Sequence, residues 1–495
     1  MLMEKIDQSI FKAYDIRGVY PDQIDADLVY KIAQAYIKLL QTDQHGSEAN
    51  GLTRKMTIVV GHDMRLSGEE FSEAVVRSLA DAGADVLDVG LVSTDQLYFA
   101  AATFPVDGGI QITASHNPKE FGGMKMVREK GYPISGDSGI YEIRDLVVSG
   151  QWLVDSGQKG KMQKQEIYDD YYKHVLKTFN VSKFKPLKIV AHANFGMANP
   201  AIEKLKTLLP VEFIKVVDAG LDGNFPKGAS DPLLPTNRKE MIAAVKELKP
   251  DLGVAWDGDG DRCFFYDENG EFVTPAYASA LFAKYYLQKH PGAKILHDTR
   301  VVRVIDYIVA ENGGEVVMNK AGHSFIKERM IKDQIEFGCE TSGHYYFKDN
   351  FYLDNGLIPF LAMLDILSSV VPPSPSDPFD MAQGHPEQSR SGEERGRGEV
   401  VSFSEVLRPL RERFFISEEI NFEYNNKNIL EEVKNKYSDA TIDNVDGYDF
   451  NYPSWRFNVR LSNTQNLLRI NLEADSAELL KQKTDEVCGL IDKIK

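Results

Sequence analysis

The chain has 495 residues, of which 43% are hydrophobic and 10% aromatic. Domains usually span ~100–200 residues, so this length predicts roughly three to five domains and excludes a single small module. Acidic residues outnumber basic ones by 74 to 57, and the formal net charge is −17. We therefore expect no nucleic acid and no membrane as partner, because both are bound by basic surfaces. A small phosphorylated substrate remains compatible with this charge, since a few local Arg and Lys side chains suffice to bind it.

The cysteines and the N-terminus indicate the cellular compartment. Cys263, Cys339 and Cys488 are few and show no CxxC spacing, which disfavours a disulfide framework and a structural zinc site. Residues 1–18 lack the apolar segment of a secretory signal. The longest apolar stretch, 356–371, falls short of the ~20 residues that span a bilayer and predicts a buried core helix. We expect a soluble, cytoplasmic protein.

Strands and helices alternate along most of the chain. The first block is predicted to contain a strand at 57–60, a helix at 69–83 and strands at 86–90 and 108–113. The second has a strand at 188–194, a helix at 197–208 and strands at 212–217 and 252–256. The third has a strand at 294–298, a helix at 301–312, a strand at 315–318 and a helix at 323–332. Three such blocks predict α/β domains with parallel or mixed sheets covered by helices.

The remaining segments have a different character. Strands at 418–424, 456–462 and 467–474 and helices at 427–437 and 476–494 predict a smaller α+β domain. Residues 372–399 are rich in Pro, Gly, Ser and charge, and we expect a disordered surface-loop insertion whose deletion changes stability and turnover little. The predicted domains span 1–162, 163–271, 272–411 and 412–495.

The sequence DGDGDR, Asp257 to Arg262, is the first motif that indicates chemistry. Asp257, Asp259 and Asp261 alternate in a glycine-containing loop between two predicted strands, DLGVAW and CFFYDENG. Their like charges would repel without a cation. A calcium EF-hand is excluded because Arg262 stands where a glycine is required and because the flanks are strands, so Mg²⁺ fits best.

The sequence TASHNP, 113–118, places Ser115 just after a predicted strand, with His116 and Lys125 nearby. Ser115 is either an acyl-transfer nucleophile or a carrier of a phosphoryl group. The GxSxG pattern of α/β-hydrolases is absent, and the metal loop favours phosphoryl transfer. Two weaker motifs follow: ETSGH, 340–344, suits hydrogen bonding to sugar hydroxyls, and VRLSNT, 459–464, suits phosphate binding.

The order of these motifs, together with FKAYDIRG at 11–18, resembles the α-D-phosphohexomutase family, most closely its bacterial phosphomannomutase/phosphoglucomutase branch. The resemblance runs from Phe11 to about Arg469. It implies three similar α/β domains with mixed sheets around a central cleft, followed by a C-terminal α+β domain resembling the TATA-binding-protein fold. The four domains would carry the phosphoserine loop, the metal loop, the sugar-binding loop and the phosphate-binding loop in turn.

The activity that this resemblance implies is the interconversion of hexose 1-phosphate and hexose 6-phosphate. Phosphorylated Ser115 would give its phosphoryl group to the substrate, and the resulting 1,6-bisphosphosugar would turn around and return its other phosphoryl group. Ser115, Asp257, Asp259 and Asp261 would share Mg²⁺. Glucose 1,6-bisphosphate or mannose 1,6-bisphosphate would act as activator, and the partner would be a small hexose phosphate.

The resemblance also implies roles for further residues. Arg262 and Lys125 would spread the developing charge, with Arg17, Tyr14 and His116 close to the phosphoserine. His323, His344 and Lys125 are unranked candidates for moving the hydroxyl proton. Glu340 and Ser342 would bind sugar hydroxyls, with Arg300 nearby, where relatives often carry Lys. The phosphate that does not react would be held by Arg460, Ser462, Asn463 and Thr464, followed here by Gln465 and Asn466 in place of an acid and a proline.

Several alternatives stay open at this point. Phosphoglucosamine mutase is the nearest, although Gly260 favours the hexose branch over the alanine typical of glucosamine enzymes. A metal-dependent phosphatase or serine hydrolase would not need a bisphosphate, and a non-catalytic binding protein would not need the nucleophile. Mannose and glucose differ at C2, which the expected contacts do not address, so we expect both to be accepted. The sequence does not distinguish a monomer from a dimer.

Overall fold

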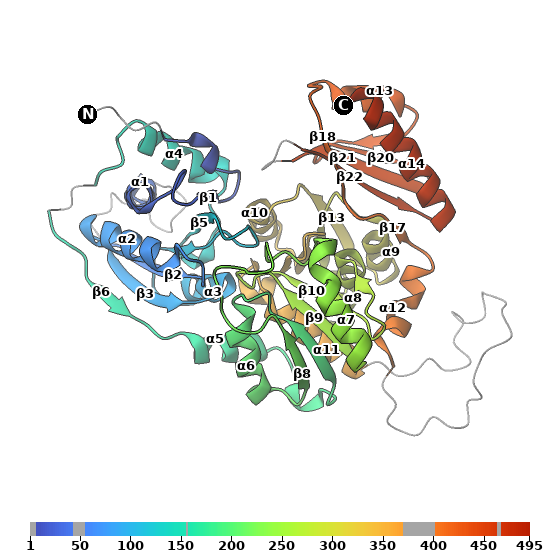
Figure 1. The fold of residues 1–495 in the computed structure, drawn as a ribbon, viewed down its shortest axis with the longest axis horizontal. Coiled ribbons are helices and arrows are strands. Elements are labelled where there is room, and N and C mark those ends of the chain that lie inside the picture. Colours follow the sequence, from blue (N-terminus) through green and yellow to red (C-terminus); the bar gives the residue numbers. More distant parts are fainter. Residues whose placement is uncertain (1–5, 43–54, 155–156, 370–400, 463–466) are drawn as a thin grey trace.

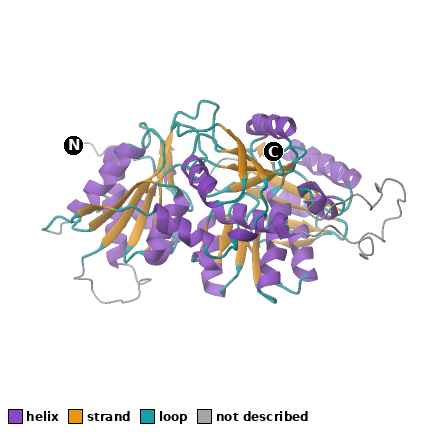
Figure 2. Ribbon diagram, turned by 90° about the horizontal axis from the view of Figure 1, so that it is seen from below, coloured by secondary structure: helices purple, strands orange, loops and turns teal. Residues whose placement is uncertain are grey.

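A computed structural model of the protein describes residues 6–42, 55–154, 157–369, 401–462 and 467–495. The predicted insertion at 372–399 lies outside these residues. Four sheets follow one another along the chain, coloured blue, green, yellow-olive and red in Figure 1. Helices flank the sheets, as the second view shows (Figure 2). The α/β class predicted from the alternating elements is confirmed.

The first sheet has the order β1-β5-β4-β2-β3-β6. Its strands are β1 (Ile16–Val19), β2 (Thr57–His62), β3 (Asp85–Leu91), β4 (Gly108–Ile112), β5 (Phe121–Arg128) and β6 (Met162–Lys164). Its helices are α1 (Ala26–Thr42), α2 (Gly68–Asp81), α3 (Thr94–Thr103) and α4 (Tyr141–Val148). β2 pairs in parallel with β3 and β4, whereas β5 runs antiparallel to β4 and β1.

The second sheet has the order β11-β10-β9-β7-β8. Its strands are β7 (Lys188–His192), β8 (Glu212–Val217), β9 (Leu252–Trp256), β10 (Cys263–Tyr266) and β11 (Phe272–Val273). The helices of this segment are α5 (Tyr168–Leu176), α6 (Ala198–Leu208) and α7 (Lys239–Leu248). The third sheet, β13-β12-β14-β15-β16, follows it in the chain.

The strands of the third sheet are β12 (Lys294–Asp298), β13 (Glu315–Asn319), β14 (Phe337–Cys339), β15 (Tyr345–Phe347) and β16 (Leu353–Asp354). The helices are α8 (Pro275–Lys289), α9 (Arg303–Glu311), α10 (His323–Asp333) and α11 (Leu357–Ser369), with α12 (Phe403–Arg411) leading to the fourth sheet. α11 is the predicted core helix and contacts α5, α8 and β10. Within the described ranges, none of the helices combines the length and the apolar character that a bilayer span requires.

One strand pattern occurs in all three of these sheets. A first strand pairs in parallel with a second and a third, and the third begins an antiparallel hairpin: β2, β3, β4 and β5; β7, β8, β9 and β10; β12, β13, β14 and β15. A further antiparallel strand closes each pattern, and in the first sheet this strand, β1, comes from earlier in the chain. The turn of each hairpin carries one of the predicted motifs.

The fourth sheet is antiparallel and has the order β17-β22-β21-β20-β19, with β18 also paired to β22. Its strands are β17 (Phe415–Ile416), β18 (Ile420–Glu423), β19 (Thr441–Asp443), β20 (Tyr448–Asn451), β21 (Trp455–Leu461) and β22 (Leu467–Ala474). α13 (Ile429–Lys436) and α14 (Ala477–Ile494) complete the α+β unit seen in red in Figure 1. Its expected likeness to the TATA-binding-protein fold stays a prediction.

Candidate active site

A cavity of about 740 Å³ is lined by residues that belong to all four sheets and their loops. The three hairpin turns described above meet there, and β21 and β22 supply side chains from the fourth sheet. The cavity brings together thirteen of the residues predicted from the sequence: Tyr14, Arg17, Ser115, His116, Lys125, Arg262, Arg300, His323, Glu340, Ser342, His344, Arg460 and Ser462. The predicted Asn463 and Thr464 lie outside the described residues.

Ser115 lies in the turn between β4 and β5, fully buried, with a φ of 52°. Few residues other than glycine adopt this left-handed conformation, and it is common at functional sites. The backbone N–H of Ser115 donates to Thr113 Oγ1 at 2.8 Å. The Ser115 hydroxyl lies 3.3 Å from Asp257 Oδ2 and 3.2 Å from His116 Nδ1. The serine therefore faces the metal loop of the next sheet.

Arg65, which the sequence analysis did not single out, holds the serine turn in place. One guanidinium nitrogen donates to the carbonyls of Ser115 and Asn117, each at 2.6 Å. The other donates to the carbonyls of Pro118 and Phe121 at 2.9 and 3.1 Å. A single buried side chain thus satisfies four backbone oxygens of one irregular turn, which fixes the position of Ser115.

The sequence does contain a signal for Arg65. His62-Asp63-Met64-Arg65 follows β2, and His297-Asp298-Thr299-Arg300 occurs at the equivalent end of β12. In both, the arginine N–H donates to the preceding aspartate Oδ1, at 3.0 Å for Arg65 and 2.8 Å for Arg300. Comparison of the two segments would have identified Arg65, because Arg300 was among the predicted residues.

The loop between β9 and β10 holds Asp257, Asp259 and Asp261, all fully buried, with carboxylate oxygens within 4.8 Å of one another. Lys125 Nζ contacts Asp259 at 2.8 Å and Asp261 at 2.5 Å, and Thr94 donates to Asp259 at 2.5 Å. A side chain at Gly258 would lie 2.8 Å from the Ser115 carbonyl, so this close approach of the two loops requires glycine.

This carboxylate cluster fits a magnesium ion. Asp259 Oδ1 and Asp261 Oδ1 are buried without a hydrogen-bond partner among the described residues. Burial and repulsion by its neighbours raise the pKa of Asp261 to about 7 and that of Asp257 well above its usual range. Buried like charges are costly unless a cation is present, and hard carboxylate oxygens are ligands that Mg²⁺ prefers.

Three cationic or imidazole side chains surround Ser115. Arg262 Nη2 donates to His116 Nδ1 at 2.5 Å, and Arg262 Nε lies 3.4 Å from Asp257. Burial, together with the positive charges of Arg262 and Arg17, lowers the pKa of His116 well below its ordinary value. Arg17 donates to Asn117 Oδ1 at 2.8 Å and to Asp15 at 2.7 Å. This positive environment suits a phosphoryl group on the serine.

The turn between β14 and β15 presents Glu340, Ser342 and His344 to the cavity. Glu340 accepts hydrogen bonds from the Tyr346 hydroxyl, from the Gly322 N–H at 3.1 Å and from Arg300 at 3.3 Å. Burial raises the pKa of Glu340. The Ser342 hydroxyl and His344 Nδ1 lie 3.0 Å apart. These groups combine donors and acceptors in the way that adjacent sugar hydroxyls require.

His323 is the first residue of α10, and its ring and that of Tyr14 form a T-shaped pair with a centroid distance of 5.2 Å. Neither of its ring nitrogens, although buried, has a hydrogen-bond partner within the described part of the chain. Burial lowers the pKa of His323 and of His344 well below the ordinary value. Both histidines are therefore neutral near pH 7 and can accept a proton.

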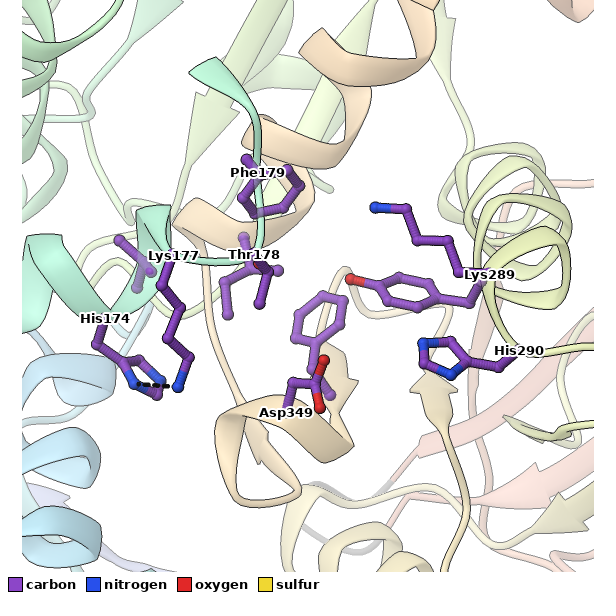
Figure 3. Close-up of a pocket in the computed structure, with 11 residues that line it drawn as sticks. His174, Lys177, Thr178, Phe179, Lys289, His290 and Asp349 are labelled. Carbon is purple, nitrogen blue, oxygen red and sulfur yellow. Dashed lines mark hydrogen bonds between the residues drawn. The ribbon is translucent and has the colours of Figure 1, made fainter. Parts of the chain in front are cut away.

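A second, smaller cavity of about 80 Å³ lies elsewhere, between the end of α5, the end of α8 and the segment after β15 (Figure 3). His174, Lys177, Lys289, His290 and Asp349 surround it. It contains none of the residues predicted from the sequence. The size of the larger cavity and its buried polar groups identify that cavity as the candidate active site.

Family models cover most of the chain in four consecutive segments. The models for domains I, II and III of phosphoglucomutase/phosphomannomutase, each described as alpha/beta/alpha, match residues 8–151, 169–270 and 274–382. The model for the C-terminal domain of the same family matches residues 419–490.

Individual relatives agree with these matches. A phosphomannomutase of Vibrio cholerae is 38% identical over 493 residues, covering 98% of each chain. A crystal structure of a phosphoglucomutase/phosphomannomutase family protein from Burkholderia thailandensis has a TM-score of 0.82 and 30% identity, covering 99% of this chain and 98% of its own. An Aspergillus fumigatus N-acetylphosphoglucosamine mutase shares the fold, with a TM-score of 0.56 at 12% identity and coverage of 94% and 98%.

Fold, site and relatives together define an enzyme of the phosphohexomutase class. Its reaction class is the movement of a phosphoryl group on a hexose phosphate. The chain belongs to the phosphoglucomutase/phosphomannomutase family.

Proposed function

We propose that the protein interconverts hexose 1-phosphate and hexose 6-phosphate, with mannose or glucose as the sugar, through a phosphoserine at Ser115 and a 1,6-bisphosphosugar. The observation that carries this proposal is the position of Ser115, buried 3.3 Å from Asp257 in a cavity that Arg17, Arg262 and Lys125 also line. The class of the Vibrio cholerae relative, a phosphomannomutase, supports mannose as one substrate.

The first step transfers a phosphoryl group from Ser115 to the free hydroxyl of the substrate. The new bond joins the sugar oxygen to phosphorus, the bond between phosphorus and Ser115 Oγ breaks, and the sugar hydroxyl loses its proton. The bisphosphate then presents its other phosphate, and the reverse transfer restores phosphoserine. Such transfers depend mainly on alignment and on stabilisation of negative charge.

The cations have different tasks in this scheme. Contact with Asp259 and Asp261 raises the pKa of Lys125 well above its ordinary value, although burial alone would lower it. Lys125 therefore stays protonated and stabilises charge. His323 and His344 are neutral and, as the remaining candidates, would accept and return the hydroxyl proton. Arg262, with His116 as its partner, orients the phosphoryl oxygens.

Asp257, Asp259 and Asp261 would hold Mg²⁺, with a phosphoryl oxygen on Ser115 completing the set. Bound there, the ion would neutralise charge on the transferring group. Two structures of the Aspergillus fumigatus mutase and its variant are described as complexes, one with GlcNAc-6P and magnesium and the other with glucose 1,6-bisphosphate. By analogy we propose Mg²⁺ as cofactor and a hexose 1,6-bisphosphate as activator of this chain.

Residues of the third and fourth sheets would bind the sugar hydroxyls and the phosphate that does not react. Glu340 and Ser342 would contact the sugar hydroxyls, while Arg300, Arg460 and Ser462 would hold the phosphate that does not react. Asn463 and Thr464 are proposed for the same task from the sequence alone. Because the bisphosphate is bound in two orientations, these contacts must serve both ends.

The first test is ³¹P NMR of the protein with Mg²⁺, a trace of glucose 1,6-bisphosphate and mannose 1-phosphate, glucose 1-phosphate or glucosamine 1-phosphate. The proposal expects conversion of the first two to the 6-phosphates. Release of inorganic phosphate would indicate a phosphatase instead, and conversion of glucosamine 1-phosphate alone would indicate the glucosamine branch.

The second test replaces Ser115 by Ala. We expect turnover to fall by a factor of about 10⁴ or more with the fold retained, since the step that carries the phosphoryl group is lost. Ser182→Ala, an exposed serine whose hydroxyl contacts Asn180, is the matched control and should keep wild-type turnover. Near-normal turnover in Ser115→Ala would refute the phosphoserine mechanism.

A further inference from the structure

Glu419 lies just before β18 and contacts two arginines of the fourth sheet inside the active-site cavity. Arg460 Nη2 donates to Glu419 Oε2 at 2.9 Å, and Arg469 Nη1 lies 3.1 Å from Glu419 Oε1. The carboxylate thus bridges two guanidinium groups. All three residues line the cavity, and none belongs to the metal loop or to the serine turn.

The arginines would repel each other without this bridge. Arg460 on β21 and Arg469 on β22 are directly opposite in the antiparallel register, and like charges in this position destabilise a sheet. Arg460 is almost completely buried, and burial together with the charge of Arg300 lowers its pKa. An anion at this place therefore stabilises the arginine pair whether or not substrate is present.

Arg460 retains capacity for a second anion. Arg460 Nε is buried and has no hydrogen-bond partner among the residues that the structure describes. A guanidinium presents several donors in one plane, and phosphate accepts two of them at once. Glu419 therefore occupies only part of a site whose chemistry suits a phosphate monoester.

We propose that Glu419 competes with the substrate phosphate for Arg460 and Arg469 and so sets how long that phosphate stays bound. The inference rests on the proposed function, in which a bisphosphate leaves this site and rebinds by its other end in every turnover. A phosphate held by two unopposed arginines would leave slowly. Glu419 lowers the affinity by repulsion and partners the arginines again when the phosphate departs.

The test is the neutral, equally sized substitution Glu419→Gln. Calorimetric titration with mannose 6-phosphate should give a Kd about tenfold lower than for the wild type, because one opposing charge is removed from a partly buried anion site. Steady-state kinetics should show a lower KM together with a lower kcat, since release becomes slower. A purely structural role for Glu419 would not lower Kd and KM.

Two further variants separate charge from position. Glu423→Gln makes the same change at an exposed position on β18 and should leave Kd and kcat unchanged. In the double variant Glu419→Gln/Arg460→Met, the tightening should disappear, because the competition acts through that arginine. If Glu419→Gln does not fold, Glu419→Ala serves as the neutral variant and should also bind more tightly.

Unchanged binding of mannose 6-phosphate in the folded neutral variants would overturn the inference. Weaker binding would also overturn it and would mean that Glu419 only orients the arginines. Without added Mg²⁺ the titration involves no turnover, so it is independent of the proposed reaction. A wild-type protein that binds mannose 6-phosphate without converting it would refute the proposed function and leave the competition measurable.

Discussion

Arg65 and Arg300 show how one residue type performs two tasks at equivalent positions. Each follows the strand that pairs in parallel with two others, β2 or β12, and is held by an aspartate two residues earlier. Arg65 turns toward the carbonyls of the serine turn, whereas Arg300 reaches Glu340 in the sugar-binding turn at 3.3 Å. The local hydrogen bonding is the same, and the neighbouring turn decides what the guanidinium binds.

At this scale we predict the effect of Arg65→Lys. Lysine keeps the charge but cannot reach four carbonyls from one plane, so buried oxygens lose their partners. Stability to urea should fall by about 2–3 kcal/mol, and kcat should fall at least about tenfold because Ser115 is less well positioned.

Arg77→Lys on the exposed face of α2 is the control and should change neither quantity appreciably. A wild-type kcat for Arg65→Lys would show that other contacts suffice to hold the serine turn.

Among the elements, several strands were predicted accurately, including 212–217, which has the bounds of β8. The expected strands at 252–256 and 294–298 also have the observed bounds. In both, a short run of mostly apolar residues is followed at once by polar turn residues. The motif turns were found for the same reason. The residues that hold those turns were not predicted. Arg65 becomes apparent only when residues 62–65 are compared with 297–300, and Glu419 acts through a contact distant in sequence that no local spacing encodes.

Helix α10 shows what such a distant contact does. Lys327, fully buried within it, donates to Asp354 of β16 at 2.9 Å and lies 4.1 Å from the centre of the Tyr98 ring on α3. The ion pair joins α10 to β16 of the same sheet, and the contact with Tyr98 joins α10 to α3, a helix of the first sheet. Because α10 begins with His323, the ion pair also positions that histidine.

We therefore predict that Lys327→Met lowers the free energy of unfolding by about 3–5 kcal/mol, because it leaves the carboxylate of Asp354 buried without its cation. Urea denaturation measures the loss. Lys332→Met, at an exposed position in the last turn of α10, should change stability by less than about 1 kcal/mol. A loss in Lys327→Met as small as that of the control would contradict the role assigned to the pair.

At the scale of the whole molecule, the attachment of the fourth sheet completes the active-site cavity, because it brings Arg460 to the same cavity as Arg300. Arg456 of β21 makes part of this attachment, together with Glu473 of β22, which accepts from the N–H groups of Val302 and Arg303. Arg456 donates to the carbonyl of Thr299 at 2.8 Å, to that of Arg300 at 3.3 Å and to Glu473 at 2.6 Å, and it also contacts Asp449. The loop that carries Arg300 is thus held directly by the fourth sheet.

Arg456→Met should weaken this attachment in a pH-dependent manner. Even beside Arg456, burial raises the pKa of Asp449 to about 6, above its value in the unfolded chain. The free energy of unfolding therefore falls as pH rises through this value, because Asp449 becomes ionised in a buried place. This fall is larger when Arg456 is removed. We expect a loss of about 3–5 kcal/mol at about pH 8 and a smaller loss at about pH 5, where Asp449 is protonated.

Urea denaturation at the two pH values measures this difference, with Arg408→Met on the exposed side of α12 as control. A loss that is equal at both pH values would contradict the proposed role of Asp449. An increase in KM for hexose 1-phosphate is also expected, because Arg300 and Arg460 would no longer be held in one arrangement.

The recurring hairpin of the first three sheets has an evolutionary consequence. If one ancestral unit was duplicated, the turn at the same place in each copy became free to specialise, and here the copies hold Ser115, the three aspartates and Glu340. Because each copy carries a different function, the sequence of one turn can change with little effect on the other two. A new sugar preference can therefore arise within residues 340–344 while the phosphoryl-transfer machinery is inherited intact.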